Sequence, residues 1–209
     1  MVDRLAAEED AMQIVVTGAS SPLGQSLLRG LAAKGSLSEA DGPVPIRRIL
    51  AVDRAQGPAL FLDDRIEYVR GAFEQPRFLA RMMGTATDAI FHLAALDPGP
   101  EEGEDPAVDL ESDLTRTWDG TRALLDACRF QTVQPKVVIA STVEAAGQGG
   151  CEAARSRAGA LAAMCELLIA EGARRRIVQS RCVRLATLAD ESALAEAVAD
   201  LISVYETMR

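Results

Sequence analysis

The sequence predicts a doubly wound α/β fold, in which a mainly parallel sheet is covered by helices on both faces. Short runs of apolar and β-branched residues alternate with stretches in which leucine and alanine recur at helical spacing. The strand-like runs are nearly all apolar, as expected for strands buried on both sides. The chain has 209 residues, 48% of them hydrophobic, so we expect residues 1–209 to form one domain.

The first half of the chain begins with a strand, a tight turn and a helix. Residues 12–17 are β-branched and apolar and lead into Gly18, and leucines then recur at helical spacing over residues 23–31. Residues 35–45 contain glycine, proline and serine, and we expect a loop there. Residues 46–53 then form an apolar strand that ends on Asp53.

The middle of the chain repeats the pattern of strand, helix and strand. We expect a short strand over residues 66–70, an amphipathic helix over 76–83 and an apolar strand over 88–95. Residues 97–105 carry prolines and several acidic side chains, and we expect an exposed, solvated loop without a function of its own.

The last part of the chain predicts three helices and two strands. Long helices are expected over residues 110–130 and 152–176 and a shorter one over 191–205, with strands at 136–140 and 178–185. One side of the first long helix is expected to be buried, and it carries Leu114, Trp118, Thr121, Leu125 and Cys128.

The charge balance argues against several classes of partner. The chain has 22 basic and 31 acidic residues, and a net charge of −9 disfavours nucleic acid and anionic membrane surfaces. The sequence has no apolar run of about 18 residues, the minimum for a membrane span. Residues 1–10 are too acidic for a signal or transit peptide, and we expect a cytoplasmic protein.

Several residue types that enzymes use for proton transfer are scarce. The chain has two lysines, Lys34 and Lys136, two tyrosines, Tyr68 and Tyr205, and one histidine, His92. Four cysteines are spread without a C-x-x-C pair, and with a single histidine they predict no metal site. We expect reduced and mostly buried thiols at Cys128, Cys151, Cys165 and Cys182.

The turn at residues 17–24 has the features of a phosphate-binding loop. It contains Gly18 and Gly24 and joins a strand to a helix, where backbone N–H groups can approach a pyrophosphate. Asp53 lies at the end of the next long strand, where a carboxylate accepts the ribose hydroxyls of NAD and repels the extra phosphate of NADP. The alternative is an ordinary strand-to-helix turn followed by an aspartate that caps a helix.

With these motifs the chain resembles the extended short-chain dehydrogenase/reductase superfamily, in its NAD-dependent epimerase/dehydratase branch, and most nearly the D-erythronate dehydrogenase-like members. The resemblance implies a Rossmann-like sheet and covers nearly the whole chain. It is carried by residues 17–19 with Gly24, Asp53, residues 89–95, 119–125, 137–147, 166–168 and 183–185.

The resemblance also implies a cofactor site, with some departures from the family pattern. The middle glycine of the loop is replaced by Ser21 in one alignment, or a glycine is replaced by Pro22 in the other. Ala72 stands where the family has an aspartate that contacts adenine. We therefore expect NAD to bind more weakly than in the family. The residues implied for the cofactor are Gly18, Ser20, Ser21, Leu23, Gly24, Asp53, Arg54, Ala94 and Ala95.

The catalytic groups of the family are mostly missing. Family members use a tyrosine and a lysine four residues later, with a serine or threonine and an asparagine. Thr142 keeps the serine/threonine position, but Ala158 and Ala162 replace the tyrosine and lysine, and Thr117 replaces the asparagine. No Tyr-x-x-x-Lys sequence occurs anywhere in the chain. We expect two alanines one turn apart to leave a roomier, more apolar pocket.

The sequence thus indicates a degenerate member of the family that binds NAD(H) without the redox catalysis of its relatives. Such a protein would act as a sensor, a scaffold or a partner subunit. The family has a C-terminal substrate domain, and the chain continues for only about 25 residues after Leu185. We expect that domain to be absent, and a homodimer or heteromer to form through the two long helices.

An enzyme with altered chemistry is the alternative. A lyase, an isomerase, a hydrolase or an atypical oxidoreductase would use Thr142, Glu144, His92 or Cys151, which are expected near the ends of the strands. Their order along the chain has no spacing typical of a nucleophile and its base. We expect His92 to be a packed structural residue.

Overall fold

The computed structural model describes residues 11–55, 63–72, 75, 77–93, 115–145, 156–186 and 188–208. The strands are β1 (Met12–Thr17), β2 (Ser36–Glu39), β3 (Gly42–Asp53), β4 (Ile66–Arg70), β5 (Ala89–His92), β6 (Lys136–Thr142) and β7 (Gln179–Leu185). The helices are α2 (Pro22–Lys34), α3 (Phe78–Met83), α5 (Gly120–Cys128), α6 (Arg157–Arg174) and α7 (Glu191–Glu206), with a π-helical turn η1 (Thr115–Asp119) and a 3-10 turn η2 (Val143–Ala145).

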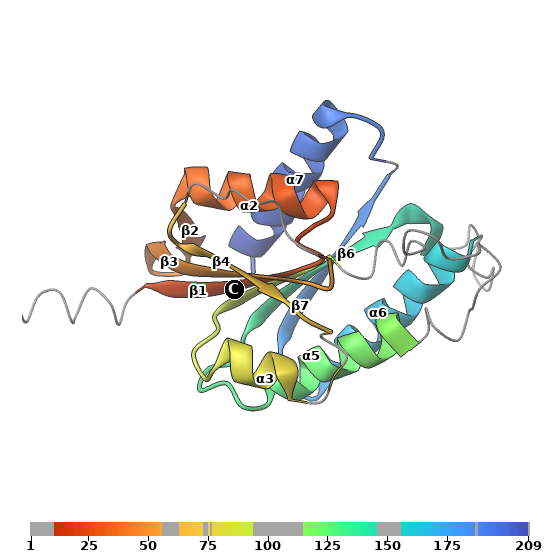
Figure 1. Cartoon of the computed structure of the whole chain (residues 1–209), viewed down its shortest axis with the longest axis horizontal. Helices are drawn as coiled ribbons and strands as arrows, with labels where there is room; N and C mark the ends of the chain where they lie inside the picture. Colours follow the sequence, from red (N-terminus) through yellow and green to blue (C-terminus); the bar gives the residue numbers. More distant parts are fainter. Residues whose placement is uncertain are drawn as a thin grey trace, which may run out of the picture.

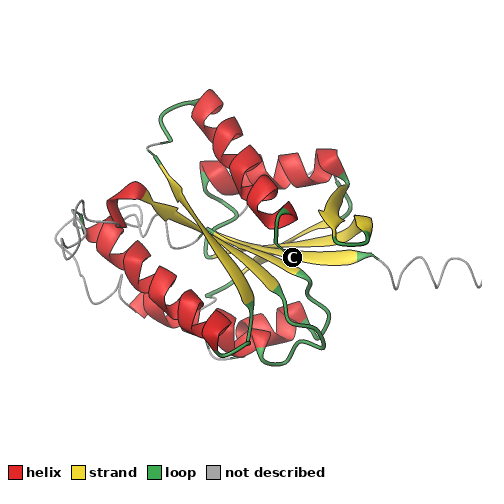
Figure 2. Ribbon diagram, turned by 180° about the vertical axis from the view of Figure 1, so that it is seen from behind, coloured by secondary structure: helices red, strands yellow, loops and turns green. Residues whose placement is uncertain are grey.

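The strands form one mixed, mostly parallel sheet, which confirms the expected Rossmann-like fold. Its order is β2-β3-β1-β5-β6-β7, and β4 pairs with the second half of β3. Of these pairings, β2 with β3 is antiparallel and the others are parallel. Helices α2 and α7 cover one face, and α3, α5 and α6 cover the other (Figures 1 and 2).

Two apolar layers hold the helices to the sheet. Successive strand residues point to opposite faces, so Ile14 and Val16 pack under α2 and α7 whereas Val15 packs under α3, α5 and α6. Both layers are almost completely buried, which explains why the central strands contain so few polar residues.

The structure corrects the expectation of a loop over residues 35–45. This segment forms a hairpin in which β2 pairs with the first residues of β3, Leu37 opposite Val44. Gly42 has a positive φ of 125° at the turn, and Pro43 and Pro45 are tolerated because the hairpin lies at the sheet edge. The segment looks like a loop in the sequence because its residues are mostly small and polar.

The helix expected over residues 110–130, of which 110–114 lie outside the described residues, differs from the expectation in two ways. Residues 115–119 form the π-helical turn η1, and α5 ends at Cys128. The wider π turn changes the angular spacing of the side chains, so Thr117 is buried and Trp118 is 41% exposed, contrary to the expected buried stripe. The helix expected over 76–83 likewise begins at Phe78. No helix in the described ranges is long and apolar enough to cross a membrane.

A cluster of polar side chains connects the end of α7 to the amino ends of the parallel strands. The Tyr205 hydroxyl donates a 2.5 Å hydrogen bond to Glu39, and Lys136 pairs with the same carboxylate. Lys136 Nζ also lies 5.4 Å from the centre of the Tyr205 ring. The neighbouring Glu206 accepts from the Ser38 backbone and pairs with Lys34. These contacts therefore join the hairpin to α2, β6 and α7 at the amino ends of the parallel strands.

Removing the Tyr205 hydroxyl should destabilise the protein. In Tyr205→Phe the ring still packs against Phe91, but Glu39 loses a donor in a half-buried setting, so we expect the free energy of unfolding to fall by about 1–2 kcal/mol. Urea denaturation measures the change. Thr207→Val, which removes an exposed hydroxyl two residues later, is the control and should change stability by less than about 0.5 kcal/mol. Equal effects of the two substitutions would contradict a role for the cluster.

Candidate functional site

The phosphate loop is held in shape by its own serine. Ser21 caps α2 by accepting a 3.0 Å hydrogen bond from the Gly24 N–H, and its hydroxyl donates to the Gly18 carbonyl at 2.8 Å. Ser21 has a φ of −63°, so its backbone conformation does not require glycine. Pro22 is the first residue of the helix, a position where its missing N–H costs nothing. Replacing the family glycine at either position is therefore compatible with an intact loop.

Gly24 is required by a close approach of the helix to the loop. A methyl group at this position would overlap the Gly18 carbonyl oxygen and lie 2.8 Å from Ala19 Cα. Gly18 itself has a positive φ of 73°, and its N–H donates to the Val52 carbonyl. Leu23, also implied by the resemblance, is buried in the core under α2. Leu23 therefore supports the loop from inside the fold.

Asp53 joins the phosphate loop to the end of β3. One carboxylate oxygen accepts the Ser20 N–H at 2.8 Å, and the other accepts the Ala55 N–H at 3.1 Å. A carboxylate oxygen can accept more than one hydrogen bond, so both retain capacity for ribose hydroxyls. Asp53 thus lies beside the helix N-terminus that would face a pyrophosphate, as the sequence predicts.

Two residues that the sequence did not indicate also lie at this end of the site, beside Asp53 and Ser20. Tyr68 on β4 lies beside Asp53, with its hydroxyl 3.5 Å from the Ala55 carbonyl. Burial raises the pKa of Tyr68 to about 12, and the negative charge of Asp53 adds to the rise. Gln25 donates to the Ser20 carbonyl at 2.8 Å from the side of α2. Both depend on tertiary contacts that the spacing of the residues does not reveal.

Arg54 lies at the end of β3 next to Asp53 and is half-buried. Its carbonyl accepts a 3.1 Å hydrogen bond from the Arg70 guanidinium, which connects the ends of β3 and β4. Ala94 and Ala95, the other cofactor residues implied by the resemblance, lie outside the described residues. So does Cys151, one of the residues of the alternative enzyme mechanism.

Thr142 ends β6, so it lies at the carboxyl ends of the parallel strands, as Asp53 does. Its hydroxyl oxygen accepts a 3.3 Å hydrogen bond from the Glu144 N–H, so it stabilises the turn that follows the strand. Glu144 in turn accepts from Ser156, which caps α6. Thr142, Glu144 and Ser156 form a set of contacts between η2 and α6.

The start of α6 packs closely against η2. A methyl group at Gly159 would lie 2.5 Å from the Glu144 carbonyl oxygen. Ala158 is half-buried, and Ala162, one turn later, is completely buried. Helix packing therefore already surrounds the position that would carry the family lysine. The expectation of a roomier pocket there stays a prediction.

His92 is a packed residue, as expected. It is 1% exposed, and its ring nitrogens lie 2.7 Å from the Thr17 hydroxyl and 3.0 Å from the Thr121 hydroxyl. Both ring nitrogens therefore have a hydroxyl partner, and the Thr121 hydroxyl also lies 2.8 Å from the Thr117 carbonyl. Burial lowers the pKa of His92 to about 4. The imidazole is therefore neutral near pH 7 and has no exposed edge for substrate.

The described cysteines are free thiols. Cys128 and Cys165 are buried and Cys182 is exposed. Burial raises the pKa of Cys128 to about 12 and of Cys165 to about 11. These thiols stay protonated near pH 7, which argues against a thiolate nucleophile at those positions.

A half-buried carboxylate ties α6 to the last two strands. Glu166 accepts a 2.6 Å hydrogen bond from Ser141 and two from Arg184, at 2.6 and 2.9 Å. Burial raises the pKa of Glu166, but the hydrogen bonds from Arg184 and Ser141 outweigh it and leave the pKa below its usual value. Ser141, the residue next to Thr142, is therefore fixed from the helix side.

Neither of the two lysines lies at the carboxyl ends of the parallel strands, where Thr142 lies. Of the two tyrosines, one lies on that side of the sheet. Lys34 ends α2 and Lys136 begins β6, so both lie at the amino ends of the parallel strands. Tyr205 belongs to the cluster at that same edge, where burial and Glu39 raise its pKa. Tyr68 lies beside Asp53, at the opposite side of the site from β6.

Sequence comparison matches the chain to a known family. A sequence model of the NAD dependent epimerase/dehydratase family matches residues 14–162. The D-erythronate dehydrogenase of Cupriavidus necator is 32% identical over 185 residues, covering 85% of this chain and 55% of that protein. The protein of the same name from Haemophilus influenzae is 29% identical over the same shares.

A solved structure shares the fold. The crystal structure of the nucleoside-diphosphate-sugar epimerase from Agrobacterium tumefaciens matches with a TM-score of 0.66 at 24% identity. The match covers 84% of this chain and 52% of that one. The chain therefore spans about half the length of these three proteins.

The contribution of Glu166 to stability should depend on pH. Its pKa is lowered in the folded protein, so its contribution is full above the unfolded value of 4.5 and is lost as the pH falls through the folded value. Glu166→Gln should lower the free energy of unfolding by about 1 kcal/mol near neutral pH, because Arg184 is partly exposed. The deficit should shrink as the pH falls from 4.5 through the lowered pKa of the folded protein, because glutamate then becomes neutral too.

Denaturant titration at several pH values measures this deficit. Glu171→Gln is the control, because Glu171 is more exposed and pairs with the surface residues Arg174 and Arg175. Its effect near neutral pH should be smaller. A Glu166→Gln deficit that stays constant down to about pH 3 would show that charge plays no part.

Proposed function

Because the chain belongs to the NAD-dependent epimerase/dehydratase family, we propose that it binds NAD(H) and lacks the redox catalysis carried out by a tyrosine–lysine pair. It acts as an NAD(H) sensor, a scaffold or a partner subunit. The observation that supports binding is the bridge from Asp53 to the Ser20 N–H, which holds a ribose-binding carboxylate beside the phosphate loop.

The placement of the lysines and tyrosines supports the loss of redox catalysis. The family positions carry Ala158 and Ala162, whereas Lys136 and Tyr205 are bound to Glu39 at the amino ends of the parallel strands. Of the four family positions, Thr142 keeps a hydroxyl, and its oxygen accepts the Glu144 N–H. A missing general acid or base costs about 10²- to 10⁴-fold in rate.

NAD, when bound, would accept or supply a hydride at its nicotinamide ring. The residues of this chain would hold the rest of the molecule. Gly18, Ser20 and the first turn of α2 would face the pyrophosphate, and Asp53 would hold the adenosine ribose.

Cofactor preference is the first test. Calorimetric titration should show that NAD and NADH bind at least about 10-fold more tightly than NADP and NADPH, because Asp53 hydrogen-bonds the free ribose hydroxyl and repels a phosphate. Asp53→Asn keeps an oxygen for the Ser20 N–H but removes the charge, so it should narrow this preference.

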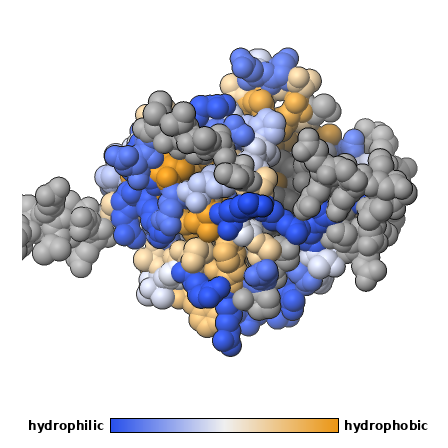
Figure 3. Space-filling model, in the orientation of Figure 1, coloured by the Kyte–Doolittle hydropathy of each residue, from blue (hydrophilic) through white to orange (hydrophobic). Residues whose placement is uncertain are grey.

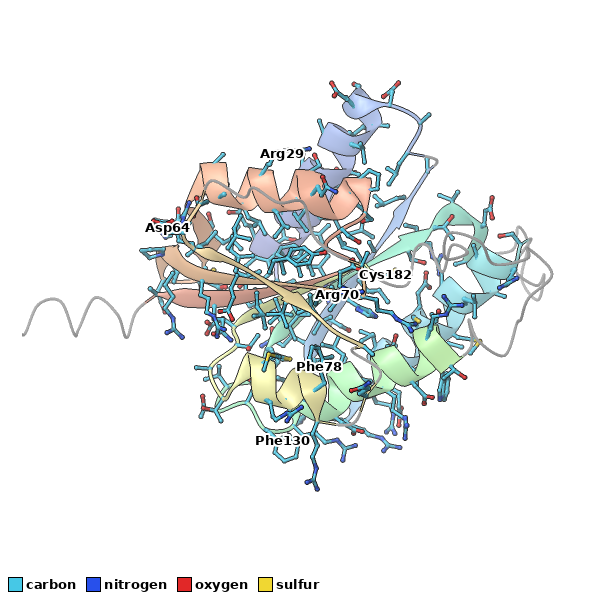
Figure 4. All side chains as sticks on the ribbon, in the orientation of Figure 1. Arg29, Asp64, Arg70, Phe78, Phe130 and Cys182 are labelled. Atoms are coloured by element: carbon cyan, nitrogen blue, oxygen red, sulfur yellow. The ribbon has the colours of Figure 1, made fainter. Side chains whose placement is uncertain are left out.

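Asp64→Asn is the matched control, because Asp64 is exposed and precedes β4, at the opposite end of that strand from Arg70 (Figure 4). It should leave both affinities unchanged. Tighter binding of NADPH than of NADH by the unmodified protein would refute the assignment of Asp53.

Turnover is the second test. Incubation with NAD and D-erythronate, the substrate in the names of two relatives, or with other hydroxy acids should produce no NADH absorbance. The D-erythronate dehydrogenase of Cupriavidus necator is the positive control. Steady NADH formation that Asp53→Asn weakens and Asp64→Asn does not would make the protein an active dehydrogenase.

A dimer through α5 and α6 is the proposed assembly. Leu167 lies near the middle of α6 and is 72% exposed, the most exposed large apolar side chain of the described residues. A partner helix packed on this face would bury it. Sedimentation should show a dimer for the unmodified protein and a monomer for Leu167→Glu. Val133→Glu, at an exposed valine after α5, is the control that should stay dimeric. A monomeric unmodified protein would contradict the proposed homodimer.

A further inference from the structure

A cavity of about 610 Å³ lies between α2 and α7, next to the phosphate loop. The two helices touch at Gly30, where a methyl group would lie 3.0 Å from Val198 Cγ1. Toward their first turns a space opens between them, and its volume is typical of sites that bind small molecules. Its polar lining consists of Ser20 in the loop, Gln25, Ser26 and Arg29 on α2, and Glu191 on α7.

The cavity adjoins the proposed cofactor site but is separate from it. Ser20 is the residue that both share: its N–H donates to Asp53 at 2.8 Å, and its carbonyl accepts from the Gln25 side chain at 2.8 Å. Asp53 is not among the described residues that line the cavity. A ligand in the cavity would therefore contact α2 and α7 rather than the carboxylate proposed to bind ribose.

Two opposite charges border the cavity, one from each helix. Arg29 lies on α2 and Glu191 on α7, and both side chains are exposed. Neither side chain forms an ion pair or a hydrogen bond with a residue in the described part of the chain. Arg29 lies on the side of α2 that faces away from the sheet, and hydrophilic residues cover the outer end of α7 (Figures 3 and 4). Both charges are therefore available to a ligand that itself carries both signs.

The rest of the lining narrows the class of ligand. A ligand with only negative charge would be repelled by Glu191, and one with only positive charge by Arg29. The Ser26 hydroxyl can donate or accept, and the Gln25 amide nitrogen is bonded to Ser20, so the Gln25 oxygen remains as an acceptor. Leu194 is half-buried and adds apolar contact. A small zwitterion with a further polar group fits these features.

We propose that the cavity between α2 and α7 binds a free α-amino acid with a polar, uncharged side chain. The carboxylate of the ligand pairs with Arg29, its ammonium group pairs with Glu191, and its side chain meets Ser26 and Gln25. This site goes beyond the proposed binding of NAD(H) and does not depend on it. Because Arg29 and Glu191 are exposed, each ion pair contributes up to about 5-fold to affinity, and the ligand binds in the millimolar range.

The test is a titration of isotope-labelled protein with L-glutamine, followed by NMR. The amide signals of Ser26 and Glu191 should shift with a dissociation constant of about 1–10 mM. Two analogues each lack one charge: N-acetyl-L-glutamine keeps the carboxylate, and L-glutaminamide keeps the ammonium group. The unmodified protein should bind each analogue about 5-fold more weakly than L-glutamine.

Two substitutions assign the charges. Arg29→Gln should remove the advantage of L-glutamine over L-glutaminamide, because the carboxylate has lost its partner. Glu191→Gln should remove the advantage of L-glutamine over N-acetyl-L-glutamine. The controls are Arg81→Gln on α3 and Glu196→Gln on α7, at exposed residues that do not line the cavity, and they should change neither ratio.

No binding of L-glutamine at about 50 mM, or equal binding of L-glutamine and both analogues, would overturn the proposed site. Shifts confined to residues away from α2 and α7 would also overturn it, because the amino acid would then bind elsewhere. If either variant fails to fold, the comparison of the three ligands with the unmodified protein still decides. NAD binding is measured separately by calorimetry, so failure of the amino acid site leaves the proposed function standing.

Discussion

The parallel pairing of β1 with β3 is the contact on which the site depends. It places Thr17 beside Val52, so the turn after β1 and the end of β3 meet at one point. The Gly18 and Ala19 N–H groups then donate to the Val52 carbonyl, and Asp53 reaches the Ser20 N–H. Without this register the carboxylate would be one residue out of place and on the other face of the sheet. The loop and the ribose-binding group are therefore fixed by the same ladder.

Many polar groups near the ends of the strands form hydrogen bonds within the protein. Thr142 holds the turn before η2, His92 lies between two threonines, and Ser141 is bound to Glu166. A group with its hydrogen bonds satisfied and its pKa far from neutrality is a poor proton shuttle. The hydrogen bonds of these described groups therefore hold the ends of the strands in place.

The sequence predicts the sheet, its central strands and the position of Asp53, because alternating apolar runs and glycines report directly on burial and backbone conformation. It does not reveal the hairpin at residues 36–45, where pairing at an edge and contacts with Tyr205 and Glu206 outweigh weak local preference. The exposure of Trp118 depends on a π turn, whereas the prediction of a buried side used the regular spacing of an α-helix. Tyr68 comes to lie beside Asp53 through the order of the strands, which is a property of the whole fold.

A crystal structure of the protein grown with NADH tests most directly whether this fold binds the cofactor without catalytic groups. We expect the adenosine ribose hydroxyls to contact Asp53 and the pyrophosphate to face the first turn of α2. The nicotinamide ribose should contact neither a tyrosine nor a lysine. These expectations would be contradicted by a dinucleotide bound away from Asp53 and the phosphate loop, or by a tyrosine or lysine hydrogen-bonded to the nicotinamide ribose.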